Sequence, residues 1–213
     1  CVPELRCVLE TLLAESRELG LFGVSLGACF GLMAAGTLPL SQALLVSPVV
    51  DLPGLIEGMM AAAGVTPERL EQERVIPVPD SQPLDWDYYC FAREHTPAHW
   101  NIPTRVLIGG RDELEPPEVT QAFCRGNGCA LEILPDAGHW LHTPQELEAM
   151  RGWIRAALES ACSKQGVKFF RPSPILCTDN AAMIGAAGYY EYLKGVRHGW
   201  DLNAVPNLKL GER

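Results

Sequence analysis

The stretch from Leu19 to Ala35 constrains the fold of this chain more than any other part of it. Apolar residues lead into Gly23-Val24-Ser25-Leu26-Gly27, and a run of small residues follows. This pattern predicts a strand that enters a helix through a tight turn, with Ser25 exposed at the turn. We expect Gly23 and Gly27 to be required by the turn, because a side chain at either position would collide with neighbouring backbone. The alternative is a Gly-rich buried strand with the pentapeptide present by chance.

Composition limits the class of protein. The chain has 213 residues, of which 47% are hydrophobic, and its formal net charge is -9. The apolar content predicts a soluble globular protein, and no apolar run is long enough to span a membrane. The acidic net charge argues against a protein that binds mainly phosphate backbones, because such proteins have an excess of basic residues. The 8 cysteines show no Cys-x-x-Cys pair. With no signal peptide visible, we expect free thiols in a cytoplasmic protein rather than disulfides or a zinc site.

Hydrophobic periodicity predicts alternating helices and strands up to about residue 160. Helices are expected over 4–17, 28–35 and 116–124 and from 144 onward, and strands over 21–24, 43–46, 104–108 and 131–134. This alternation predicts a mostly parallel sheet with flanking helices. Thr143 and Glu146 form a capping-box pattern before the last helix, on which Leu147, Met150, Ile154 and Leu158 are expected to face the core.

Residues 51–101 interrupt this alternation. The segment contains two helical patterns, a Pro-rich stretch and an aromatic cluster, Trp86, Tyr88, Tyr89, Phe91 and Trp100. An insertion of this length between two strands is too long for a plain loop. We expect a small helical lid over a site. The alternative is an ordinary crossover helix with additional loops.

Asp112 and His139 directly follow predicted strands, as Ser25 does. In a parallel sheet the carboxyl ends of the strands meet at one edge, so these three side chains are expected together. Their order along the chain, Ser then Asp then His, is that of the α/β-hydrolase fold. Residues 106–113 resemble the acid-bearing strand and turn of that family, and residues 137–146 resemble its histidine loop. The resemblance covers about residues 1–158.

The resemblance implies a serine hydrolase that acts on a small ester, thioester or amide without a cofactor. The acyl part of that substrate would be held by the aromatic cluster of the lid. Ser25 would be the nucleophile, His139 the general base and Asp112 the residue that orients the imidazole. The backbone N–H of Leu26 would supply half of the oxyanion hole. His142 is a weaker candidate for the base because it lies next to the helix cap, and His95 and His99 lie in the lid.

The beginning of the chain departs from the family pattern. A complete domain has several strands before the strand-to-helix turn that carries the serine, called the elbow, and a loop after an early strand supplies the second oxyanion N–H. Here one predicted helix precedes the elbow, and the chain starts at Cys1 within it. We therefore expect that upstream sequence is missing. Loss of one oxyanion donor typically lowers the rate by a factor of ~10² to 10³, so weak or absent activity is expected.

The last part of the chain follows a different pattern. Residues 1–160 contain 10 Arg, no Lys and 22 acidic residues, whereas residues 161–213 contain 4 Lys, 3 Arg and 4 acidic residues. The segments CTDNAAMIGAAGYYEYLKG and DLNAVPNLKL closely resemble the C-terminal end of the tRNA N6-adenosine threonylcarbamoyltransferases, which have an actin-like ATPase fold. We therefore expect two parts, a hydrolase-like domain over 1–160 and a transferase-like fragment over 161–213.

That second resemblance implies a role for Asp179 as a ligand of a divalent metal, iron or zinc, with tRNA as the partner. The family completes the site with a His-x-x-x-His motif far upstream. His95 and His99 have that spacing, but the family sequence does not surround them. Asp179 could equally be the N-cap of the apolar helix that follows.

Three hypotheses about function follow from the sequence. The first is a serine hydrolase with a small-molecule acyl substrate. The second is a tRNA-modifying acyltransferase. The third is an inactive fusion product whose tail serves as an interaction segment.

Overall fold

The computed structural model describes residues 2–16, 18–79, 82–96, 100–170 and 189–196. Its contacts divide the chain into two compact units, Cys1–Ala157 and Leu158–Arg213. The boundary expected at residue 160 on grounds of sequence resemblance stays a prediction.

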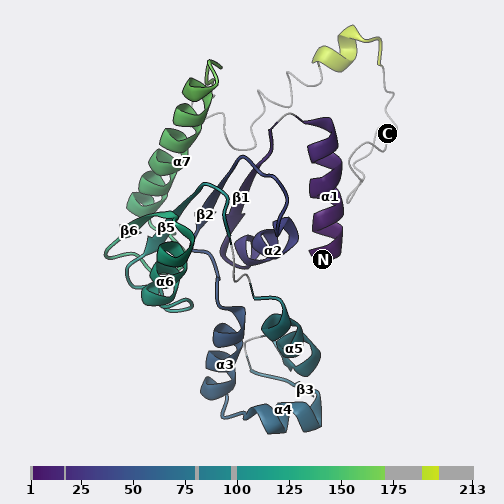
Figure 1. Ribbon diagram of the computed structural model, residues 1–213, viewed down its shortest axis with the longest axis vertical. Coiled ribbons are helices and arrows are strands. Elements are labelled where there is room, and N and C mark those ends of the chain that lie inside the picture. The colour runs from purple at the N-terminus through teal and green to yellow at the C-terminus, as the bar shows by residue number, and fades with distance from the viewer. Residues whose placement is uncertain (1, 17, 80–81, 97–99, 171–188, 197–213) are drawn as a thin grey trace. The chain divides into compact units, whose positions relative to one another are not determined.

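The first unit contains a four-stranded parallel sheet with the order β1-β2-β5-β6 (Figure 1). The predicted parallel sheet with flanking helices is thereby confirmed. Its elements, in chain order, are α1 (Val2–Glu15), β1 (Gly20–Val24), α2 (Ser25–Ala35), β2 (Gln42–Val46), α3 (Leu52–Ala62), α4 (Pro67–Glu73), β3 (Val75–Ile76), β4 (Leu84–Asp85), α5 (Trp86–Glu94), β5 (Thr104–Gly109), α6 (Pro117–Asn127), β6 (Ala130–Leu134) and α7 (Pro144–Lys164).

The central strands β2 and β5 carry buried side chains on both faces of the sheet. Successive side chains of a strand point to opposite faces, so each strand contributes to two cores. On β2, Ala43 and Leu45 pack in one core with residues of α2 and α6, whereas Leu44 and Val46 pack in a second core with residues of α7. This explains why β2 reads as a continuous apolar run in the sequence. β1 pairs with β2 in the described part of the sheet, and its Phe22 is 53% exposed.

Helix α7 begins at the predicted capping box. The Thr143 N–H donates to Glu146 Oε2 at 2.8 Å, and the Glu146 N–H donates to Thr143 Oγ1 at 3.3 Å. The expectation that Leu158 lines the buried face is wrong, because Leu158 is 38% exposed and Trp153 and Ala157 are the buried residues. The buried face of α7 is rotated from the predicted one, because the bulky indole of Trp153, rather than the leucines, packs on the sheet.

The lid segment is built from α3, α4 and α5 together with the antiparallel pair β3-β4 (Figure 1). Asp51, Thr66 and Asp85 are the N-cap residues of the three helices, and each side chain accepts a backbone N–H of the first turn. The two expected helices are present as α3 and α4, whereas α5 forms where the sequence analysis expected only an aromatic cluster. The sequence analysis missed the β3-β4 pair, because strands of two residues are too short to show a period.

In the second unit, the described residues comprise the end of α7 and a short helical turn over 189–193. Six cysteines fall in the described part of the molecule, and all six are free thiols. Within those same ranges, no helix combines the length and apolarity needed to cross a membrane.

Candidate active site

Ser25 lies at the first position of α2, directly after β1, with a φ of 50°. A positive φ is strained for a residue with a side chain, and it turns the chain sharply from strand to helix. At Gly23, an added Cβ would lie 2.6 Å from the Ala28 Cα, so β1 and α2 approach closely only because position 23 is glycine. At Gly27 an added Cβ would meet nothing within 4 Å. The expected collision at Gly27 is therefore wrong, because this residue lies on the open side of α2.

The structure brings Ser25, His139 and Asp112 into one chain of hydrogen bonds. Ser25 Oγ lies 2.8 Å from His139 Nε2, and His139 Nδ1 lies 2.8 Å from Asp112 Oδ2. A carboxylate can only accept hydrogen bonds, so Nδ1 carries the proton and Nε2 is left to accept from the serine hydroxyl. His139 is 3% exposed and Asp112 is 7% exposed, so the pair is shielded from water.

Asp112 is held as a carboxylate by several donors. Its Oδ1 accepts the backbone N–H groups of Leu114 at 3.0 Å and Glu115 at 2.9 Å, in addition to its contact with His139. Burial by itself disfavours the charged form, but the hydrogen bonds from His139 and the backbone outweigh it and lower the pKa of Asp112. An anionic Asp112 fixes the imidazole in the tautomer that the serine needs.

Two glycines allow the histidine loop to cross the end of β5. A Cβ added at Gly109 would lie 2.3 Å from the Gly138 carbonyl oxygen, and one added at Gly110 would lie 2.6 Å from the Pro135 carbonyl oxygen. Side chains at these positions would push the loop away from the sheet. Gly109-Gly110 therefore sets the approach of His139 to Asp112, a role that the sequence analysis did not assign.

Glu115 is a second feature that the sequence analysis missed. Its side chain is buried, and Oε1 accepts the backbone N–H groups of Val50 and Asp51, each at 2.9 Å. Burial raises the pKa of Glu115, although the two hydrogen bonds oppose this rise. The carboxylate ties the turn that carries Asp112 to the start of α3. No distinct signal in the sequence pointed to it, because Glu115 is one of several acidic residues in the segment 111–118, RDELEPPE.

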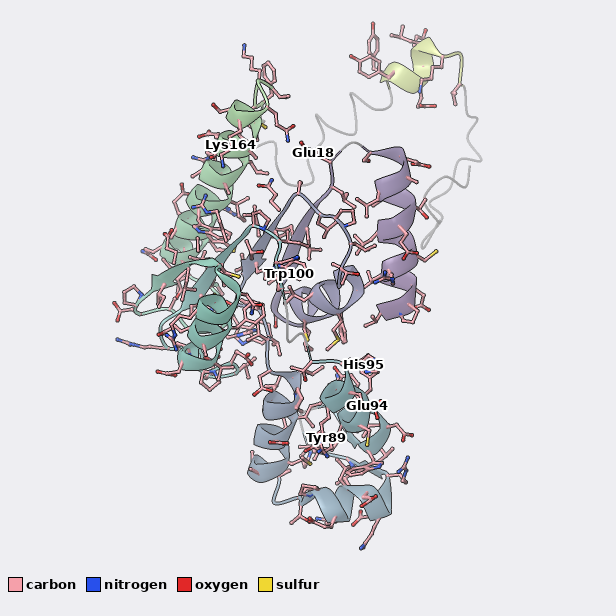
Figure 2. The ribbon with its side chains drawn as sticks, in the orientation of Figure 1. Glu18, Tyr89, Glu94, His95, Trp100 and Lys164 are labelled. Atoms are coloured by element: carbon pink, nitrogen blue, oxygen red, sulfur yellow. The ribbon has the colours of Figure 1, made fainter. Side chains whose placement is uncertain are left out.

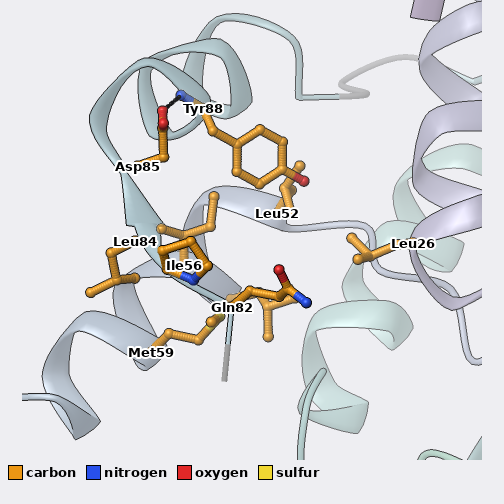
Figure 3. Close-up of a pocket in the computed structure, with 10 residues that line it drawn as sticks. Leu26, Leu52, Ile56, Met59, Gln82, Leu84, Asp85 and Tyr88 are labelled. Atoms are coloured by element: carbon orange, nitrogen blue, oxygen red, sulfur yellow. Dashed lines mark hydrogen bonds between the residues drawn. The ribbon is translucent and has the colours of Figure 1, made fainter. Parts of the chain in front are cut away.

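A cavity of about 440 Å³ lies beside the elbow (Figure 3). Leu26, the residue after Ser25, lines it together with residues of α3, β4 and α5. The cavity therefore joins the strand-to-helix turn of the sheet to the lid. Its lining includes Leu52, Ile56, Met59 and Leu84, so its walls are mainly aliphatic.

The aromatic cluster of the lid contributes less to this cavity than expected. Tyr88 lines it, but Tyr89, which lies in the lid (Figure 2), is buried. The Tyr89 hydroxyl donates to Glu57 Oε1 at 2.6 Å. Trp100 belongs to the core beside the sheet, and its Nε1–H donates to Thr104 Oγ1 at 2.6 Å. Tyr89 and Trp100 therefore stabilise the fold, and mainly aliphatic side chains form the cavity.

The other sequence candidates do not join this constellation. His142 is exposed, and His95 ends α5 with Nδ1 2.8 Å from the Phe91 carbonyl oxygen. His99 and Asp179 lie outside the described residues. The described ranges contain no group of three or more His, Cys, Asp or Glu side chains that could hold a metal ion. The role of the Leu26 N–H in an oxyanion hole stays a prediction.

Comparison with solved structures shows the fold of the first unit. Mouse alpha/beta hydrolase domain-containing protein 10 superposes with a TM-score of 0.59 and 17% identity, over 75% of this chain and 70% of that chain. Est1E from Butyrivibrio proteoclasticus superposes with a TM-score of 0.53 and 18% identity, over 72% of this chain and 69% of that one. No protein-family model matches the chain.

Comparison with curated sequences finds a different set of relatives. The tRNA N6-adenosine threonylcarbamoyltransferase of Clostridium botulinum strain Hall is 57% identical over 65 residues, which is 30% of this chain and 19% of that protein. The enzyme of Clostridium novyi strain NT is 58% identical over 60 residues, 28% of this chain and 18% of that protein. The chain thus spans about a fifth of the length of these curated relatives. It combines an α/β-hydrolase fold over most of its length with a short segment similar to the threonylcarbamoyltransferases.

Proposed function

We propose that the first unit is a serine hydrolase that cleaves a small ester, thioester or amide through Ser25, His139 and Asp112. The observation that carries this proposal is the continuous hydrogen-bonded chain from Ser25 Oγ through both ring nitrogens of His139 to Asp112. A chance meeting of three residues from three separate strand ends does not account for its order and burial. The fold shared with hydrolases of known structure is in keeping with this chemistry.

The geometry suggests the usual two-step reaction. Ser25 Oγ attacks the carbonyl carbon as its proton passes to His139 Nε2, and Asp112 stabilises the resulting imidazolium. The Leu26 N–H, at the start of α2, would donate to the negative oxygen of the tetrahedral intermediate. The bond to the leaving group then breaks as His139 returns the proton to it. Water, deprotonated by His139, releases the acid from Ser25 by the same steps.

Labelling and burst kinetics test the nucleophile. A fluorophosphonate probe is expected to label the wild type at Ser25, and a p-nitrophenyl ester is expected to release one equivalent of p-nitrophenol in a burst. Ser25→Ala should abolish both. Ser41→Ala is the matched control, because Ser41 is exposed and its hydroxyl donates to the Leu19 carbonyl oxygen, away from His139. Equal p-nitrophenol release by wild type and Ser25→Ala would rule out the serine mechanism.

The threonylcarbamoyltransferase activity is a second candidate, favoured by the 57% identity over 65 residues. Under it, Asp179 would bind a divalent iron or zinc ion and tRNA would be the partner. A chain active in neither assay would be an inactive fusion product. For the location of the protein we propose the cytoplasm, because the free thiols of its described cysteines suit a reducing compartment.

A further inference from the structure

The cavity beside Ser25 has a definite direction. Leu26 lies at one side, and Leu84 and Met59 lie at the other (Figure 3). Because Leu26 follows the nucleophile in the chain, its side of the cavity is the one next to the reaction. A group that enters from Ser25 would therefore run from Leu26 toward Met59.

Helix α3 sets the length of the cavity. It contributes Leu52, Leu55, Ile56 and Met59, which share one helix face at spacings of three, four and seven residues. Seven residues correspond to a rise of about 10 Å along an α-helix. With single bonds of about 1.5 Å, an extended carbon chain advances about 1.3 Å per bond, so about eight carbons would match this length. The volume of about 440 Å³ falls within the range of small-ligand pockets, about 300 to 1,000 Å³.

The lining chemistry selects against a charged end group. The ten lining residues include no Lys or Arg, and three carry polar groups: Gln82, Asp85 and Tyr88 with its hydroxyl. The Asp85 carboxylate accepts the Tyr88 N–H at 2.8 Å as the N-cap of α5. A substrate with a carboxylate at the end of its chain would place that charge near Asp85 at the far end of the cavity. The carboxylate would be desolvated without a cationic partner and repelled by Asp85. The cavity therefore suits an uncharged aliphatic chain.

We propose that this cavity is an acyl-chain subsite for straight, uncharged chains of about six to ten carbons, an estimate from the helix rise along α3. Met59, at the far end, limits the chain length. This inference rests on the proposed function and makes it specific, because it replaces a general small acyl substrate with a medium-chain ester or thioester.

Chain-length profiles test the subsite. With p-nitrophenyl esters from acetate to dodecanoate, kcat/KM is expected to rise about fourfold per added methylene up to about eight carbons and then to fall. Met59→Trp should move the optimum at least two carbons shorter, and Met59→Ala should move it longer. Val75→Trp is the matched control, because Val75 is 48% exposed on β3 and does not line the cavity. The two Met59 variants shift the optimum in opposite directions, so a folding defect in one of them does not decide the test.

A binding experiment separates this inference from the proposed function. Calorimetry with Ser25→Ala should detect methyl octanoate and give much weaker binding of methyl butyrate, whether or not the wild type is catalytic. Binding that depends on chain length in a protein without hydrolase activity would support the subsite and reject the proposed function. Hydrolysis with a flat chain-length profile, unchanged in both Met59 variants, would support the proposed function and overturn the subsite.

Discussion

At the scale of single residues, Glu115 is the most informative side chain beyond the three that form the hydrogen-bonded chain. Its carboxylate holds the Val50 and Asp51 N–H groups, and its own N–H donates to Asp112. Asp51 in turn caps α3 through a hydrogen bond from the Gly54 N–H. One buried residue thus connects the acid of the candidate site with the helix that lines the cavity.

We expect Glu115→Gln to become more stable relative to the wild type as the pH rises from about 4.5. The folded-state pKa of Glu115 is raised, mainly by burial, so the stability that Glu115 contributes is present below its ordinary pKa of 4.5 and is lost as the pH rises through the folded value. Gln keeps an acceptor oxygen for Val50 and Asp51 but does not ionise. Urea unfolding at several pH values between 4 and 8 would measure the difference.

Two further variants make this test specific. Glu115→Ala leaves two backbone N–H groups without their acceptor, so it should be about 2 to 4 kcal/mol less stable than Glu115→Gln at every pH. Glu118→Gln, on the exposed first turn of α6, controls for the loss of one negative charge. A constant difference between Glu115→Gln and the wild type across the pH range would contradict the raised pKa.

At the scale of elements, the strand-to-helix turn depends on one of its two glycines. Gly23→Ala places a methyl group 2.6 Å from backbone of α2, so β1 and α2 must separate, with an expected loss of about 1 to 3 kcal/mol. Gly27→Ala meets no atom within 4 Å and should stabilise α2 by about 0.5 to 1 kcal/mol. Thermal unfolding of the two variants would show opposite shifts. Equal destabilisation by both would restore the symmetric expectation drawn from the motif.

At the scale of the whole molecule, the two parts of the chain carry separate hypotheses that can be tested in one protein. We expect dialysis against a chelator to leave ester hydrolysis unchanged, because the proposed reaction at Ser25 uses no metal. Asp179→Asn should likewise leave fluorophosphonate labelling unchanged. Loss of hydrolysis on dialysis would contradict the serine mechanism.

The same samples report on the transferase hypothesis. Iron or zinc retained by the wild type after dialysis against buffer, lost in Asp179→Asn and kept in the control Asp201→Asn, would favour it. Elemental analysis gives the metal content directly.

Local sequence signals predicted the elements well. The Thr143 and Glu146 capping box joins groups three residues apart, so its formation depends little on the rest of the fold. The alternation of helical and strand patterns likewise led to the parallel sheet, because parallel neighbours require crossover connections. The position of Ser25 at a strand-to-helix turn was also predicted locally, from the apolar run before it and the small residues after it.

What the sequence by itself determined was therefore the elements around the four-stranded sheet, their order and the three strand ends that carry Ser25, Asp112 and His139. It did not determine α5 or the β3-β4 pair of the lid. Tertiary structure decided which surfaces meet: Glu115 reaches Val50, 65 residues away, and Leu26 shares a cavity with Met59. It also decided that Gly27 faces open space and Leu158 faces outward. The physical reason is that the hydrophobic periodicity of a segment specifies which face of a helix or strand is apolar. The rotation and offset of that face depend on how large side chains such as Trp153 pack against distant parts of the chain.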